Sequence, residues 1–166
     1  GRQLDWNLGR SAEQRMPYWC NAISTGGQFY AHFLSRRVTV TNADGREISS
    51  VELTPETRES HFLSPNLSPN GRFLVTRDNS RIERYDTATG KHLGTVADYS
   101  KLERSKRRDG WSPSAVVSLS PCGRYVVATP NIGKDVVPID VYETTSGTQL
   151  GEWATPRWAG ATSFIF

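Results

Sequence analysis

The residues best suited to binding chemistry lie in the stretch 101–108, which reads KLERSKRR. It sets five basic side chains against the single acid Glu103, and the aromatic residue Trp111 follows shortly after. Guanidinium and ammonium groups donate several hydrogen bonds to phosphate or carboxylate oxygens. Such a cluster is therefore suited to phosphate, an acidic peptide or an anionic surface. The alternative is a solvated, charged loop without a partner.

Other kinds of chemistry lack residues at a suitable spacing. The histidines His32, His61 and His92 have no cysteine or second histidine at the spacing of metal ligands. The sequence contains neither a Gly-x-Ser-x-Gly segment nor a glycine-rich phosphate loop. It therefore predicts no catalytic residue, no cofactor and no metal site within this chain.

The composition suits a soluble globular protein rather than a disordered or membrane protein. Apolar residues make up 36% of the chain, charged residues make up 22%, and the formal net charge is +3. No apolar run approaches the roughly 18 residues that a membrane-spanning helix needs. The charge is too small to indicate nucleic acid by itself.

The elements that must position the basic stretch are internal repeats. LSPNGRFLVT at 67–76 returns as LSPCGRYVVAT at 119–129, and AISTGGQFYAH at 22–32 fits the same frame. Each phrase leads to a second glycine turn about 20 residues later, and GRQL at the start of the chain has the form of that turn. The glycines of this second turn are Gly1, Gly45, Gly90 and Gly147.

Each repeat predicts four short strands, here called a to d. Strand a precedes the first turn, strand b follows it, strand c alternates apolar and polar residues, and strand d follows the second turn. Alternation and β-branched or aromatic residues favour strands over helices. A four-stranded antiparallel unit of about 40–45 residues has the length of a propeller blade. The expected fold class is all-β, a partial β-propeller of about three consecutive blades.

The predicted organisation is a single partial β-propeller domain over 1–166. Because propellers close with about four to eight blades, the remaining blades are expected in the same longer chain or in other copies. The expected parts are the end of a preceding blade at 1–15, blades at 16–56, 57–100 and 115–156, a basic loop at 101–114, and the start of a next blade at 157–166.

The sequence resembles the WD-repeat family, in particular the WD-like blades of the SPDG type. The resemblance is carried by LSPNGRFLVT…RIERYDTATGKHLGTV (67–96) and covers about residues 2–150. The position that is usually Trp in the family is Thr41, Tyr85 and Tyr142 here, and the Asp of the b–c turn is missing. The resemblance therefore implies the fold, while the hydrogen-bonded side-chain tetrad of a strict WD blade is largely absent.

The resemblance also implies two unlike faces. In the family, the b–c and d–a connections lie on one face, which we call the loop face. The a–b and c–d turns lie on the other, the turn face. Both insertions of this chain, at 97–114 and 130–135, then fall on the loop face, and long loops on a rigid frame are where binding concentrates. The residues expected to bind a partner there are Arg36, Arg37, Arg77, Arg81, Lys101, Arg104, Lys106, Arg107, Arg108, Trp111 and Lys134.

Three functions follow from the resemblance and the basic loop. The first is a non-catalytic scaffold that mediates protein–protein interaction through the loop face, so that the partner is a protein. The second is the propeller domain of a larger enzyme, peptidase-gating or quinoprotein-like, with catalytic residues outside this chain. The third is binding of a nucleic acid or an anionic surface by the basic loop.

Two residues depart from the pattern of the repeats. Arg84 takes a strand c position where the other units have Val40 and Val141. It lines the central channel, pairs with a neighbouring acid, or faces the edge with its stem packed on the sheet, and we expect the last. Trp153 takes the position of Val96 and is expected to pack between blades.

Overall fold

The computed structural model describes residues 22–24, 26–34, 37–54, 64–77, 81–101, 115–130 and 136–156. These residues form three antiparallel sheets of four strands, each sheet in chain order. The first blade holds β1 (Ala22–Ile23), β2 (Phe29–Leu34), β3 (Arg37–Asn42) and β4 (Glu47–Glu52). The second holds β5 (Ser64–Leu67), β6 (Phe73–Arg77), β7 (Arg81–Asp86) and β8 (Lys91–Asp98), followed by the 3-10 helix η2 (Tyr99–Lys101). The third holds β9 (Ala115–Leu119), β10 (Tyr125–Pro130), β11 (Val136–Glu143) and β12 (Gln149–Pro156).

The prediction of four strands per repeat is confirmed, with small differences at strand ends. Pro130 was expected in the b–c loop, but it closes β10 and pairs with Ala115. β5 begins at Ser64 and includes Pro65, which an edge strand tolerates because one side of its backbone has no strand partner. The predicted flanking parts at 1–15 and 157–166 lie outside the described residues, as does most of the basic loop.

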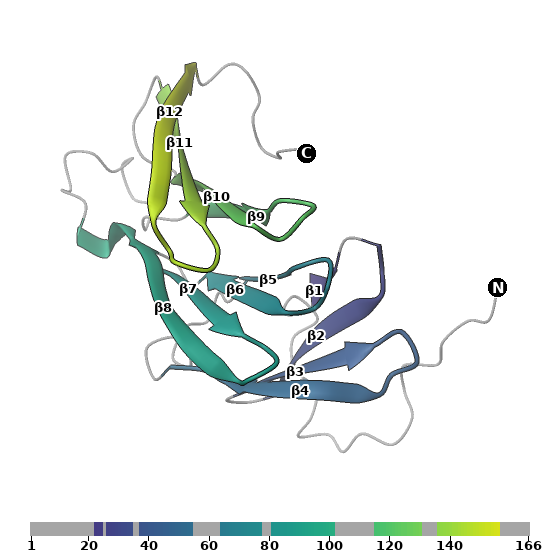
Figure 1. Cartoon of the computed structure of the whole chain (residues 1–166). Coiled ribbons are helices and arrows are strands. Elements are labelled where there is room, and N and C mark those ends of the chain that lie inside the picture. Colours follow the sequence, from purple (N-terminus) through teal and green to yellow (C-terminus); the bar gives the residue numbers. More distant parts are fainter. Residues whose placement is uncertain are drawn as a thin grey trace.

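The blades are arranged so that their first strands lie inward. In Figure 1, β1, β5 and β9 point toward the middle of the arrangement, whereas β4, β8 and β12 lie on its outer side. Two apolar clusters fill the spaces between blades. The apolar core therefore lies between the sheets and is shared by neighbouring blades.

The repeated phrase folds into one hairpin geometry. In the second blade, the N–H of Gly71 donates to the carbonyl of Ser68 at 2.9 Å, and the Ser68 hydroxyl accepts the N–H of Phe73 at 2.8 Å. The corresponding serine–aromatic pairs, Ser24 with Phe29 and Ser120 with Tyr125, have the same hydroxyl bond at 3.0 Å. Sequence reasoning explained the glycine but missed the serine, although that serine recurs at the same position in all three phrases.

A shared β-bulge shapes the outer strand of each blade. The pairing between strands c and d shifts by one residue at the same place in the three sheets. This shared shift leaves Ile48, Leu93 and Leu150, one apolar residue of strand d in each blade, without a cross-strand partner. A second shift in the second blade, between Ile82 and Glu83, leaves Val96 of β8 without a partner as well.

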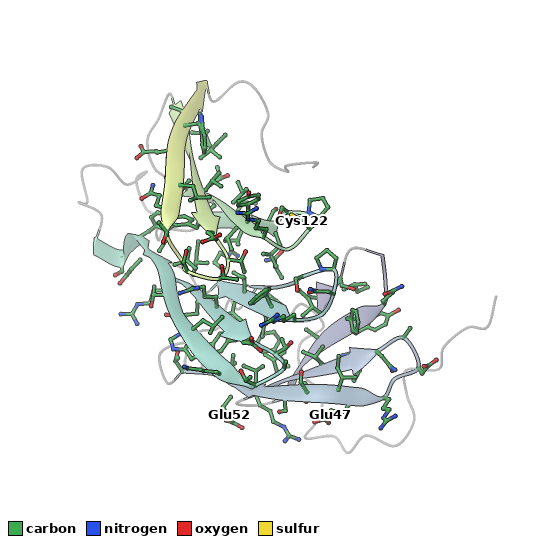
Figure 2. The ribbon with its side chains drawn as sticks, in the orientation of Figure 1. Glu47, Glu52 and Cys122 are labelled. Carbon is green, nitrogen blue, oxygen red and sulfur yellow. The ribbon has the colours of Figure 1, made fainter. Side chains whose placement is uncertain are left out.

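The two kinds of turn lie together, as expected for the turn face. The N–H of Thr87, in the c–d turn, donates to the carbonyl of Arg72 in the a–b turn at 2.8 Å, and Thr144 binds Arg124 in the same way. Figure 2 shows Glu47 and Glu52 toward opposite ends of β4, which join the turn face and the loop face respectively.

Candidate protein-binding face

The loop face carries four of the basic residues predicted to bind a partner. Arg37 begins β3, Arg77 ends β6, Arg81 begins β7 and Lys101 ends η2. The other predicted residues lie outside the described part of the chain: Arg36, Arg104, Lys106, Arg107, Arg108, Trp111 and Lys134.

Two of the described arginines of this face, Arg77 and Arg81, form bonds within the chain. Arg81 forms an ion pair with Asp98 at 3.4 Å, and Arg37 lies opposite Glu52 in the β3–β4 register. Arg77 donates a hydrogen bond from Nη1 to the carbonyl of Ala115, the first residue of β9. The frame therefore presents mixed charge, and the excess of basic residues belongs to the loop that it carries.

Asp98 organises the start of that loop. Its carboxylate accepts the N–H of Ser100 at 2.9 Å and also the Ser100 hydroxyl. Partial burial alone would raise the pKa of Asp98, but the bonds from Ser100 and the charge of Arg81 outweigh it and hold that pKa below its usual value. The carboxylate stays ionised and turns the chain into η2.

Tyr99 fastens the same end of the loop to the third blade. Its buried hydroxyl donates to the carboxylate of Asp140 in β11 at 2.7 Å, and the side-chain amide of Gln149 donates to the other oxygen at 3.4 Å. Burial, followed by the bond to Asp140, raises the pKa of Tyr99 above its usual range. With Arg77 on Ala115 at the other end, both ends of the connection between η2 and β9 are held at the junction of two blades.

Sequence reasoning missed Tyr99 and Asp140 because they belong to different repeats. Their contact joins residues 41 positions apart. The available signal was Asp140 itself, an acid within the otherwise apolar run VVPIDV (136–141). A buried carboxylate needs a donor, but the sequence does not show which blade supplies it.

Replacing Tyr99 with Phe tests this attachment. At neutral pH we expect a loss of about 1–3 kcal/mol of unfolding free energy, since Asp140 stays buried without its hydroxyl donor. The raised pKa also predicts how the stability changes with pH. Above about pH 10 a tyrosine in the unfolded chain loses its proton, while Tyr99 in the folded chain keeps it. The free energy of unfolding therefore decreases as the pH rises, and it decreases less in the Tyr99→Phe variant, which has no hydroxyl to titrate. Urea unfolding at several pH values measures both effects, with Tyr125→Phe as the control. Equal loss in both variants would contradict the assignment.

Arg84 corrects an expectation from the sequence. It is buried rather than facing the edge, and its guanidinium donates to the carbonyls of Thr144 at 2.8 Å, Ser146 at 3.0 Å and also Thr145. A further bond reaches the carbonyl of Leu93 at 2.7 Å. Burial lowers the pKa of Arg84. The residue clamps the second blade to the c–d turn of the third, which reasoning from a single repeat could not reveal.

A second buried acid, Glu83, binds side chains of its own blade. Its carboxylate lies 2.6 Å from Nε2 of His92 and accepts the hydroxyl of Thr95 at 3.0 Å. Glu83 occupies in the second blade the position of Asp140 in the third, but it bonds within its own blade, whereas Asp140 also binds Tyr99 from the second repeat. In the described ranges, no three His, Cys, Asp or Glu residues are grouped so as to hold a metal ion.

Among the described residues, a cysteine side chain is exposed on the turn face. Cys122 lies in the β9–β10 turn (Figure 2), with its sulfur 3.3 Å from the Ser120 hydroxyl. That hydrogen bond, followed by one from the backbone of Arg124, lowers the pKa of Cys122. The residue lies across the blade from the loop face.

The arrangement of the blades is similar to that in several solved structures. The β-propeller domain of the Trilobed protease from Pyrococcus furiosus is similar, with a TM-score of 0.50 and 14% identity over 81% of this chain and 42% of that chain. The fold is a β-propeller. A eukaryotic initiation factor matches with a TM-score of 0.50 and 13% identity over 83% of this chain and 33% of that chain. The Cps50 (Swd1) β-propeller domain of Myceliophteria thermophila matches with a TM-score of 0.49 and 16% identity over 80% and 40%.

The propeller spans less than half the length of each of these structures. No protein-family model and no curated protein matches the sequence. Within the described residues, no helix is long and apolar enough to cross a membrane.

Proposed function

We propose that this propeller is a non-catalytic scaffold of the WD-like type that binds a protein partner through its loop face. The proposal is carried by the attachment of the connection between the second and third blades. Tyr99 on Asp140 holds its start, and Arg77 on Ala115 holds its end. A basic segment held at both ends on a rigid frame is presented for binding with less ordering on contact than a free loop requires.

The charge of the frame favours a protein over a nucleic acid. Arg81 is paired with Asp98, and Arg37 lies opposite Glu52, so the described part of the face is mixed in sign. Polyanion binding rests on many unpaired basic groups, whereas protein interfaces combine a few charged anchors with neutral contacts. The expected partner surface is acidic where it meets the 101–108 segment.

Charge reversal on the two faces tests the proposal. Changing Arg107 and Arg108 to Glu is expected to lower retention of partner proteins by about tenfold or more, because opposed charges become like charges at the contact. The matched control changes Arg46 and Lys91, which are exposed on the turn face, to Glu. Immobilised full chains are compared for the proteins they retain, quantified by mass spectrometry.

The outcomes separate the candidate partners. If the control set lowers retention as strongly as the loop set, the loop face is not the binding face. Tight retention of duplex DNA by the unaltered chain, falling steeply with salt, would instead support a nucleic acid as the partner.

A further inference from the structure

Each contact between blades joins two unlike sheet faces. We call the face of a blade that meets the next blade its forward face, and the face that meets the preceding blade its rear face. The forward side chains Val40 and Val51 of the first blade pack against Leu74 and Tyr85 on the rear of the second. The second and third blades meet in the same way. There the forward residues are Val75, Ile82 and Ala97, and the rear residues are Val117, Val126 and Tyr142.

The third blade has an apolar forward face that no described blade covers. Strand register places Val127 opposite Val141, Val141 opposite Gly151, and Ile139 opposite Trp153, and paired residues share a face. Trp153 is 55% exposed, whereas Ala97, which lies opposite Ile82 at the same register position of the second blade, is 9% exposed. Val96, which the sequence aligned with Trp153, is instead a bulge residue of β8. It packs against the cluster between the second and third blades, so the expected packing between blades is seen for Val96 and not for Trp153.

The rear face of the first blade is not covered by any of the described blades. The register sets Ile23 opposite Tyr30, and Tyr30 opposite Thr41. Ile23 is 65% exposed, while Leu67, its counterpart in the second blade, is 4% exposed because the first blade covers it. The three described blades therefore present both halves of the contact that they repeat among themselves.

The turn glycines give an independent sign of the same open faces. A Cβ built on the turn glycines of the second and third blades would lie within 3.0 Å of an atom of the preceding blade. Their counterparts in the first blade, Gly27 and Gly45, would meet no atom within 4 Å. The covered glycines are Gly71, Gly90, Gly123 and Gly147.

The two open faces also differ from the closed ones in compensating ways. On the rear face, Thr41 replaces the tyrosines Tyr85 and Tyr142, which leaves room beside the sheet. On the forward face, Trp153 takes the register position of the smaller Val51 and Ala97 and adds volume. A large side chain on one face and a small one on the other favour packing between them.

We propose that the forward face of the third blade binds the rear face of the first blade in a second copy of this chain. The second copy returns the same contact, so the six described blades of two chains close into one ring. A head-to-tail contact of this kind generates a closed ring when its rotation closes, and six lies within the usual range of blade numbers. Covering two apolar sheet faces supplies the driving force.

Light scattering during size exclusion tests the proposal on the full chain. The expected mass is twice the 18.5 kDa of one chain. Trp153→Asp and Ile23→Asp are each expected to give monomers, since each places a charge in both contacts of the ring. Ile48→Asp is the matched control, because Ile48 is 47% exposed but lies in the β4 bulge rather than on either open face. Circular dichroism checks that each variant keeps its sheet content.

Mixing the two interface variants gives the sharpest test. A Trp153→Asp chain keeps an intact rear face and an Ile23→Asp chain keeps an intact forward face, so the mixture is expected to form a dimer through one contact. Non-specific association would not be restored by mixing. If the unaltered chain stays monomeric at about 100 µM, the proposal is overturned. The two open faces would then be expected to pack against further blades instead of a second copy. Loss of the dimer in Ile48→Asp would overturn it as well.

Discussion

Replacing Arg84 with Ala is expected to lower the free energy of unfolding by about 2–4 kcal/mol. The Arg84 guanidinium binds three consecutive carbonyls of the third blade's c–d turn, at Thr144, Thr145 and Ser146. Removing it leaves these buried or half-buried acceptors without their donor and opens space between two blades. Urea unfolding followed by circular dichroism measures the change.

Arg84→Lys provides the first control. Lysine keeps the positive charge but offers a single ammonium group in place of a planar fork, so it cannot reach the carbonyls of the turn and of Leu93 together. We expect a loss between that of Ala and the unaltered chain. If lysine gave full stability, the positive charge rather than the several donors of the guanidinium would stabilise the turn, and the assignment of Arg84 as a link between the two blades would be wrong.

Gly147 supplies a double-mutant cycle for the same clamp. A Cβ at Gly147 would lie 2.8 Å from the Arg84 guanidinium, and its φ of +73° is one that other residues rarely adopt. Gly147→Ala should therefore be destabilising through both strain and collision in the unaltered chain, but through strain alone when Arg84 is already Ala. The coupling between the two substitutions measures the contact itself. Additive losses would show that the two residues do not touch in solution.

The sequence was sufficient to predict the strands because their causes are local. The phrase beginning at Leu67 carries a turn glycine, an apolar alternation and β-branched residues, and each acts within a few positions along the chain. Repetition then confirmed the register, since the same turn recurred at Gly27, Gly71 and Gly123. Strand ends such as Pro130 were less certain, because pairing with Ala115 rather than local preference decided them.

The links between blades could not be predicted, because each joins residues that only the fold brings together. Arg84 looked like an exception in an apolar position until the next turn supplied its acceptors. Tyr99 and Asp140 looked unrelated until two blades met. The basic loop was visible from composition, but its attachment at both ends was not. Local periodicity therefore predicts blades, whereas polar contacts between blades depend on the arrangement around the ring.

The a–b turns allow packing between blades to be separated from backbone strain. Gly27 and Gly123 occupy the same turn position with φ of +68° and +69°. A Cβ at Gly123 would lie 2.9 Å from the Cβ of Ser68 in the preceding blade, whereas a Cβ at Gly27 would meet no atom within 4 Å. Alanine at Gly27 should therefore cost only the left-handed conformation, about 1–2 kcal/mol. Alanine at Gly123 should add about 1–3 kcal/mol for overpacking against Ser68.

The difference between Gly123→Ala and Gly27→Ala isolates the contact between the second and third blades. Both variants share the change in the unfolded chain and the same φ, so the comparison cancels these contributions. Denaturant unfolding of the two variants side by side gives the difference directly. A third variant, Gly71→Ala, should behave like Gly123→Ala, because a Cβ at Gly71 would lie 2.8 Å from the Phe29 ring. Equal losses at all three positions would mean that the a–b turns do not stack from blade to blade, and the inward packing of the ring would have to rest on the apolar clusters alone.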